Sequence, residues 1–98
     1  MQEKFEKISK KETETSQKEL VAKALAIVLN KHKNNKSNYI LAMEYGFSTS
    51  LLNLLSRGKK DPQITTIFKL SQALGMKASK FVEEMEKNLP EGFRWIEN

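Results

Sequence analysis

The chain has 98 residues, of which 39% are hydrophobic, with 17 basic residues, 12 acidic residues and no cysteine. Because a chain of this size buries only about two-thirds of its unfolded surface, the composition predicts one small domain and excludes a second core. Without cysteine, neither a disulfide framework nor a thiolate zinc site is available.

Residues 1–15 alternate lysine and glutamate and carry little apolar surface beyond Phe5 and Ile8. Burial of these few apolar groups would not offset the conformational entropy lost when the segment becomes ordered. We therefore predict a mobile charged tail that is helical when attached to a partner. Ser16 and Glu19 then form a capping-box pattern, which is typical of a helix start. The folded domain is therefore predicted to span residues 16–89 and to begin with a helix from Ser16 to about Lys33.

This first helix has a wider apolar arc than the single stripe of a surface helix. The arc consists of Leu20, Val21, Ala24, Leu25, Ile27, Val28 and Leu29. Either a second subunit or the tail folded back on the helix would cover it. The apolar stretch is interrupted by Lys23 and is too short for the roughly 20 residues of a membrane span. A signal peptide is disfavoured as well, so we expect a cytoplasmic protein with no membrane partner.

Two short helices separated by a tight break are predicted next. The first spans about Asn38–Tyr45 and stops at Gly46, a residue suited to the left-handed conformation that ends helices. Phe47 then turns inward. Ser48 is a good N-cap for the following helix, which reaches about Ser56.

Two further helices complete the domain. The helix after Pro62 has the clearest amphipathic pattern in the chain, with apolar residues three and four apart. These residues are Ile64, Ile67, Phe68, Leu70, Ala73 and Leu74. The last helix spans about Ala78–Asn88, and Pro90 prevents its continuation. Its apolar residues are Phe81, Val82 and Met85.

The terminal segment, residues 90–98, holds three large apolar groups, Phe93, Trp95 and Ile96. Side chains of this size are usually buried, so we expect the segment to dock on the core or on a partner chain. No strand pattern occurs anywhere in the chain. The predicted fold class is therefore all-α with five helices.

The net charge of +5 is concentrated in one stretch of the sequence. Six basic residues and one acidic residue lie between positions 31 and 60, whereas the other 68 residues hold 11 of each. An uncompensated basic patch is what a phosphate-binding surface requires. A basic face that is simply solvated is the alternative.

Four short motifs follow one another after residue 40. They are Leu41–Ala42, the turn Gly46–Ser48, the loop Arg57–Pro62 and the stretch Ala73–Met76. With these motifs, the chain from about Ile27 to Phe81 resembles the Cro/repressor-type (XRE) helix-turn-helix family, which has the lambda-repressor-like fold. The resemblance implies a transcriptional regulator, typically a repressor of bacterial or phage type. It also implies that a homodimer reads two half-sites of double-stranded DNA about one helical turn apart.

The third predicted helix is the one that would enter the major groove. At about 100° per residue, Thr49, Asn53 and Arg57 line up on one side of this helix, Ser50 lies beside them, and Leu52 points the opposite way. The family pattern implies that base edges are read by Thr49, Ser50 and Asn53. It implies that phosphate groups are contacted by Asn38, Ser48, Arg57, Lys59, Lys60, Lys36 and Lys31.

Two leucines depart from this pattern. Leu54 lies on the rim of the outer face, where the family usually has a polar side chain, and Leu51 lies at the border with the core. A leucine can contact a thymine methyl group, but it can also mark a protein contact. The alternative functions are therefore a helix-turn-helix module that binds another protein, with weak or no DNA binding, and a DNA-binding antitoxin.

No motif in the chain indicates catalysis, so we do not expect an enzyme. His32 is the only histidine, and the sequence shows no companion ligand or orienting acid for it, which favours a structural role. No metal, cofactor or small-molecule ligand is indicated.

Overall fold

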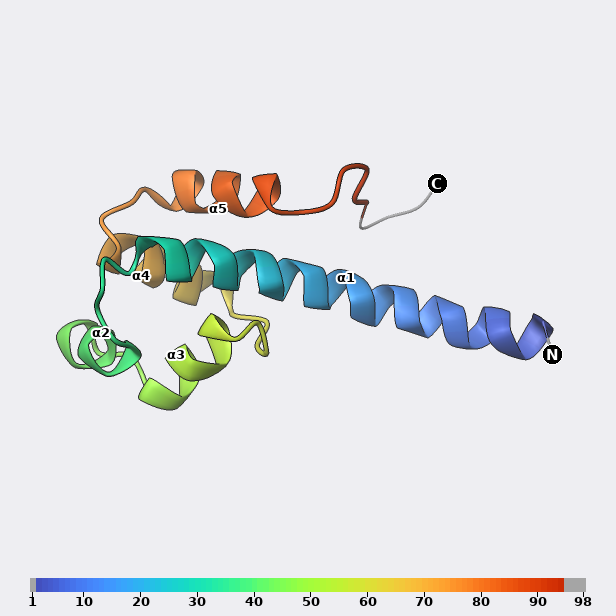
Figure 1. Cartoon of the computed structure of the whole chain (residues 1–98), viewed down its shortest axis with the longest axis horizontal. Coiled ribbons are helices and arrows are strands. Elements are labelled where there is room, and N and C mark those ends of the chain that lie inside the picture. Colours follow the sequence, from blue (N-terminus) through green and yellow to red (C-terminus); the bar gives the residue numbers. More distant parts are fainter. Residues whose placement is uncertain (1, 95–98) are drawn as a thin grey trace.

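The computed structural model describes residues 2–94 and the side chains of residues 17–94. The described residues form five helices and no strand, in the order α1 (Gln2–His32), α2 (Asn38–Tyr45), α3 (Thr49–Ser56), α4 (Ile64–Ala73) and α5 (Ala78–Lys87) (Figure 1). The all-α fold class is confirmed for this part of the chain. None of these helices combines the length and the apolar character needed to cross a bilayer.

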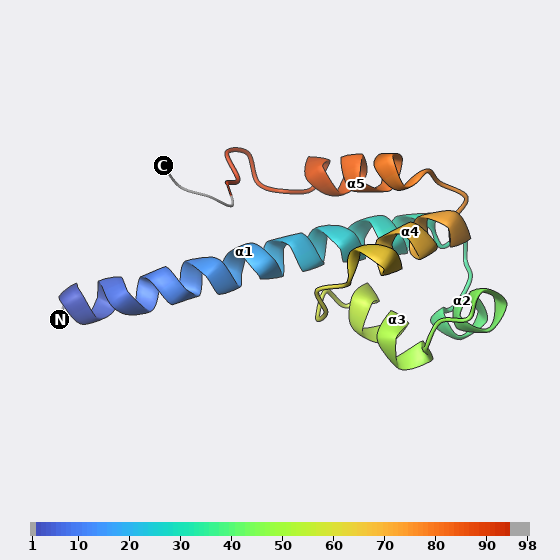
Figure 2. The same ribbon diagram turned by 180° about the vertical axis from the view of Figure 1, so that it is seen from behind.

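Helix α1 begins at Gln2, so the helix start predicted at Ser16 is wrong. The preceding residues contain no glycine or proline and are rich in lysine and glutamate, which are strong helix formers. A capping box acts only where the backbone before it is not helical, and here it is helical. This part of α1 extends beyond the other four helices (Figures 1 and 2). The mobility proposed for residues 1–15 stays a prediction.

Two asparagines end α1 and turn the chain toward α2. Asn34 and Asn35 have φ angles of 54° and 68°, a left-handed conformation that asparagine adopts more readily than most residues. The helix therefore ends at His32, one residue before the predicted end. Ser37 then caps α2, because its Oγ accepts a hydrogen bond of 3.1 Å from the amide of Ile40.

All five helices contribute to one core. Its buried members are Ala24, Leu25, Val28, Leu29, Leu41, Ala42, Leu52, Leu55, Leu70, Phe81 and Met85. Helices α3 and α5 contact α1 from opposite sides (Figures 1 and 2). Most of the apolar arc of α1 is therefore covered within the chain, and neither a second subunit nor the N-terminal segment is needed there. Ile27 is the exception, since it stays exposed.

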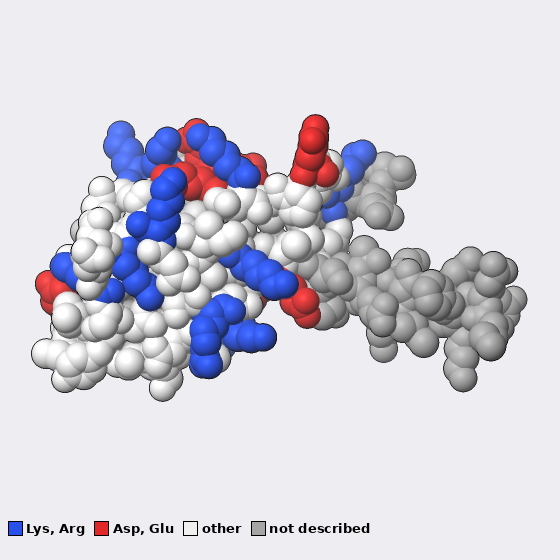
Figure 3. All heavy atoms as spheres, viewed as in Figure 1, with Lys and Arg blue, Asp and Glu red and all other residues white. Residues whose placement is uncertain are grey.

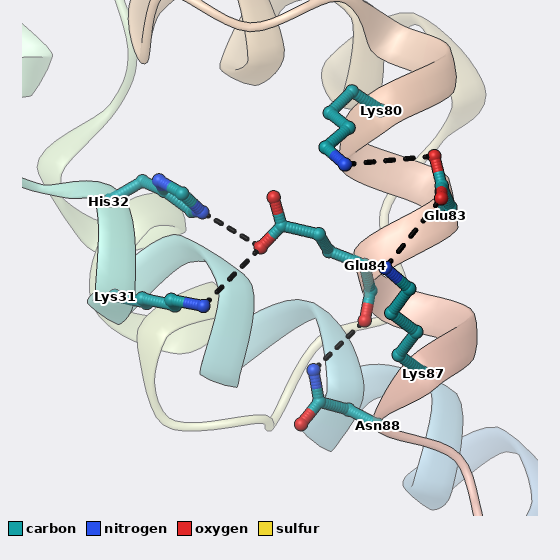
Figure 4. Close-up of polar contacts among 7 residues, drawn as sticks. All are labelled: Lys31, His32, Lys80, Glu83, Glu84, Lys87 and Asn88. Atoms are coloured by element: carbon teal, nitrogen blue, oxygen red, sulfur yellow. Dashed lines mark hydrogen bonds and ion pairs between the residues drawn. The ribbon is translucent and has the colours of Figure 1, made fainter.

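A polar clamp joins the end of α1 to α5 (Figure 4). His32 Nε2 donates to Glu84 Oε1 at 2.8 Å, and Lys31 Nζ lies 3.9 Å from the same oxygen. The hydrogen bond from His32 is the main reason why the pKa of Glu84 lies below its ordinary value. The expectation that His32 lacks an orienting acid is therefore wrong. No local pattern could reveal this partner, because 52 residues separate the two side chains.

Beyond α5 the chain runs back beside α1 (Figures 1 and 2). Leu89 packs against the core, and the side-chain amide of Gln17 donates to the backbone carbonyl of Arg94. The docking expected for Trp95 and Ile96 lies outside the described residues.

Candidate functional site

The orientation of α3 is set by the three-residue turn that separates it from α2. Gly46 has a φ of 74° and ends α2 in the left-handed conformation, while Phe47 packs against the core. Ser48 Oγ accepts a hydrogen bond of 3.2 Å from the amide of Leu51, which caps α3. The stop, the inward aromatic residue and the cap are all confirmed.

Lys69 on α4 holds this turn from a second direction. Its Nζ donates to the carbonyl of Gly46 at 3.2 Å and lies 4.8 Å from the centroid of the Phe47 ring. A cation over an aromatic face is attracted by the ring's negative face. The turn is therefore tied to the rest of the domain as well as to its two flanking helices.

Helix α3 has one buried side and one exposed side. Leu52 and Leu55 are fully buried, and with 3.6 residues per turn the residues between them face outward. Thr49, Ser50 and Asn53 are exposed. The three residues expected to read base edges thus share one accessible surface.

An asparagine network connects α2 to α3. Asn38 Nδ2 donates to Asn53 Oδ1 at 2.7 Å and to Ser56 Oγ at 3.1 Å. These two bonds use both hydrogens of the amide, so the Asn38 side chain retains no donor for the phosphate contact expected of it. Its Oδ1 is buried and has no hydrogen-bond partner among the described residues. In this arrangement Asn38 positions Asn53.

The loop after α3 packs directly on α1. Gly58 has a φ of 68°, and a Cβ built on it would lie 3.2 Å from Lys23 Cγ and 3.3 Å from Lys23 Cα. Both the left-handed backbone and the close approach therefore favour glycine here. Arg57 Nε donates to the Asn53 carbonyl at 3.1 Å, which directs the guanidinium back along α3.

The cations of this loop are uncompensated. Within the described part of the chain, no carboxylate forms an ion pair with Arg57, Lys59 or Lys60. Figure 3 shows basic side chains gathered below α1 with acidic side chains at the edge of the group, whereas basic and acidic side chains intermingle throughout along α5 at the top. A surface of the first kind attracts polyanions, because the fields of its charges add.

The same loop and α1 enclose a cleft of about 370 Å³. Its charged lining residues are Lys18, Glu19, Lys23, Lys59, Lys60 and Asp61. Four lysines outnumber two carboxylates, so the cleft extends the basic surface onto α1. Lys18 and Lys23 could not be found from local sequence patterns, because only the packing of Gly58 against α1 brings these lysines to the loop.

Two other expected phosphate contacts lie elsewhere. Lys31 lies beside Glu84 on the side of α1 that packs against α5, away from α3. Lys36 Nζ lies 3.0 Å from Glu44 Oε1 and 5.7 Å from the centroid of the Tyr45 ring. Its pKa is raised, chiefly by the hydrogen bond to Glu44. The structure therefore does not group either lysine with the uncompensated cations.

Leu51 and Leu54, two of the four leucines of α3, occupy the positions expected of them. Leu51 is partly buried and packs against the core, and the side chain of Leu54 is 36% exposed. Helix α2 adds further exposed apolar side chains, Tyr39, Ile40 and Met43. This part of the surface therefore mixes apolar and polar character.

Comparisons of the chain with family models, with curated proteins and with solved structures find no match. Within the described residues, no three side chains of His, Asp or Glu gather as metal ligands would. The α3 surface and the basic loop beside it are therefore the candidate functional site.

Proposed function

We propose that the protein is a non-enzymatic transcriptional regulator, in which α2 and α3 form a Cro/repressor-type helix-turn-helix and α3 enters the major groove of double-stranded DNA. One observation carries the proposal. Helix α3 exposes Thr49, Ser50 and Asn53 directly beside a loop whose cations have no carboxylate partner in the described part of the chain.

The exposed side chains of α3 suit base recognition. The major groove is wide enough for a helix, and each base pair presents a distinct pattern of donors and acceptors there. The hydroxyls of Thr49 and Ser50 can donate or accept, and the Asn53 amide does both. The bond from Asn38 at 2.7 Å fixes the position of Asn53 before DNA arrives, which lowers the entropy cost of binding.

The surrounding groups suit the phosphate backbone. Ser48 uses its Oγ as an acceptor toward the Leu51 amide, so its hydroxyl hydrogen can be donated to a phosphate oxygen. The loop supplies Arg57, Lys59 and Lys60, and the adjoining cleft supplies Lys18 and Lys23. Such contacts fix position and register on DNA without carrying sequence information.

The proposal is tested by separating base readout from phosphate attraction. A duplex is first selected from a random library, and binding to it is compared with binding to a scrambled duplex. Thr49→Ala and Asn53→Ala should reduce the preference for the selected duplex by about 5- to 150-fold, because one good base contact contributes roughly 1–3 kcal/mol. Lys59→Ala should weaken both duplexes alike and reduce the slope of log K against log salt by about 0.9.

Two outcomes contradict the proposal. One is the absence of any binding to the random library at low salt. The other is a loss from Thr49→Ala and Asn53→Ala that is the same on selected and scrambled duplexes. Circular dichroism of each variant controls for loss of the fold.

A protein-binding module, with or without DNA binding as in an antitoxin, is the second candidate. Leu54 favours it, because an apolar side chain that is 36% exposed on the outer face of α3 is suited to a hydrophobic contact. Leu54→Gln separates the two functions. It should leave DNA affinity within about threefold if α3 binds DNA through its polar groups, a difference below about 0.7 kcal/mol.

A further inference from the structure

The cleft between α1 and the loop after α3, which we name the α1–loop cleft, holds charges of both signs that do not neutralise one another. Its charged lining residues are Lys18, Glu19 and Lys23 of α1 and Lys59, Lys60 and Asp61 of the loop. None of these six forms an ion pair with another side chain that the structure describes. Four lysines and two carboxylates leave the lining with a net charge of +2. Both kinds of group are therefore available to a ligand that carries complementary groups.

The loop side of the cleft is held in place by its packing on α1. Gly58 lies so close to α1 that a Cβ built on it would be 3.3 Å from Lys23 Cα, and Ala22, which is buried, also lines the cleft. The backbone amides of Lys60 and Asp61 donate to no backbone carbonyl among the described residues, so they remain available as donors in the loop. The volume of about 370 Å³ lies within the range of about 300–1,000 Å³ that small-ligand sites occupy. The cleft therefore has the size of a small-molecule site.

We infer that the α1–loop cleft binds a small phosphate monoester that also carries hydroxyl groups, the chemistry that sugar phosphates and nucleotides share. Lysine ammonium groups bind phosphate as point charges. A phosphate monoester carries about −1.5 to −2 charges at pH 7, which matches the net charge of +2 in the lining. Glu19 and Asp61 offer only acceptor oxygens when ionised, so they complement hydroxyl donors on the same ligand.

The two carboxylates favour such a ligand over the backbone of duplex DNA. The lysines attract DNA as well, but its backbone presents charged phosphates and no hydroxyl group. Glu19 and Asp61 would therefore face like charge without a donor. A small ligand can turn its phosphate toward the lysines and its hydroxyl groups toward the carboxylates. A bound ligand also neutralises lysines that attract DNA and lowers the affinity for DNA, a consequence that alone rests on the proposed function.

Titration calorimetry of the full chain tests the inference, at a pH above the second phosphate pKa of about 6. The ligands are ribose 5-phosphate, adenosine monophosphate, inorganic phosphate and ribose. One ribose 5-phosphate should bind per chain, about tenfold more tightly than inorganic phosphate, because its hydroxyl groups add hydrogen bonds to charged acceptors. Ribose should not bind. Tighter binding of adenosine monophosphate identifies a nucleotide site, and equal binding of the two esters identifies a sugar phosphate site.

Substitutions locate the ligand in the cleft. Lys18→Gln combined with Lys60→Gln removes one lysine from each side and should weaken binding of ribose 5-phosphate by about tenfold or more. The matched control combines Lys80→Gln with Lys87→Gln on α5, removes the same charge and should bind like the wild type. Glu19→Gln removes an acceptor for hydroxyl groups and a charge that repels phosphate. It should therefore reduce the preference for ribose 5-phosphate over inorganic phosphate by about fivefold.

Three outcomes overturn the inference. They are the absence of saturable binding at millimolar ribose 5-phosphate and adenosine monophosphate, equal affinities for ribose 5-phosphate and inorganic phosphate, and similar losses in the two double variants. Circular dichroism checks the fold, and if the cleft double variant loses helix content, Lys60→Gln alone decides by the same comparison. The readouts involve no DNA, so failure here leaves the proposed DNA binding standing, and failure of DNA binding leaves the ligand site standing.

Discussion

The outer side of α3 and the outer side formed by α4 and α5 differ, although the same rule buries their inner sides. Leu52 and Leu55 anchor α3, and Leu70 and Phe81 anchor α4 and α5, all fully or almost fully buried. Outside, α3 carries hydroxyl and amide groups beside Leu54, next to cations that pair with no carboxylate in the described part of the chain, whereas the surface between Phe68 and Val82 is apolar. An amphipathic pattern therefore determines which side of a helix packs against the core. The residues on the other side indicate the kind of partner that the helix can bind.

The two outer surfaces call for different partners. Polar groups on α3 are hydrated, and they can exchange water for base edges and phosphate at little cost. Each Å² of apolar surface around Phe68 that is exposed to water costs about 25 cal/mol of free energy relative to burial. Covering this surface with another apolar surface is therefore favourable.

The largest effect on stability is expected when a buried phenylalanine of α5 is compared with an exposed phenylalanine of α4. Phe81 is fully buried and Phe68 is 60% exposed. Phe81→Ala should lower the free energy of unfolding by about 3–5 kcal/mol. Phe68→Ala should lower it by less than about 1 kcal/mol when urea unfolding is measured at a concentration where the chain is monomeric. Equal losses would show that Phe68 belongs to the core of the single chain.

A second, smaller effect is expected from lysines on the two sides of α1. Changing Lys18 and Lys23 to glutamine should weaken DNA binding by about 30-fold at 0.15 M salt, since each lost phosphate contact lowers the salt slope by about 0.9. At position 23, glutamine retains the Cβ and Cγ atoms that pack beside Gly58.

The matched control changes Lys80 and Lys87 on α5 to glutamine, which removes the same number of charges. This variant should bind DNA like the wild type in a fluorescence anisotropy titration. Similar losses in both double variants would mean that net charge, and not the cleft beside α3, attracts DNA.

The smallest effect concerns the clamp between α1 and α5. The pKa of Glu84 is lowered, mainly by the hydrogen bond from His32. A lowered carboxyl pKa adds stability that is fully present above the ordinary value of about 4.3 and is lost as the pH falls through the lowered value. The Tm of Glu84→Gln should therefore lie below that of the wild type at pH 6, and the gap should close toward pH 3. A gap that persists unchanged at pH 3 would contradict a role for the carboxylate charge.

Local sequence signals predicted most of the fold. Gly46 and Ser48 marked the turn correctly, because a left-handed stop and a hydroxyl cap act within a few residues of the chain. The capping box at Ser16 failed for the same reason, since a local pattern cannot show that the residues before it are already helical.

Part of the candidate site could also be predicted. Helical periodicity placed Thr49, Ser50 and Asn53 outward, and they are exposed. The bond between Asn38 and Asn53 was not foreseen, and neither was the contribution of Lys18 and Lys23, because each depends on the contact between two helices.

By itself, the sequence determined the number of helices in the described part of the chain, the two sides of α3 and the excess of positive charge between residues 31 and 60. Each of these follows from the period of the helix or from the chemistry of neighbouring residues. Tertiary structure alone decided that Glu84 meets His32, that Gly58 seats a basic loop on α1, and that Ile64 and Phe68 stay outside the core. These features depend on contacts between helices that are far apart in the sequence, and such contacts are set by the packing of all five helices together.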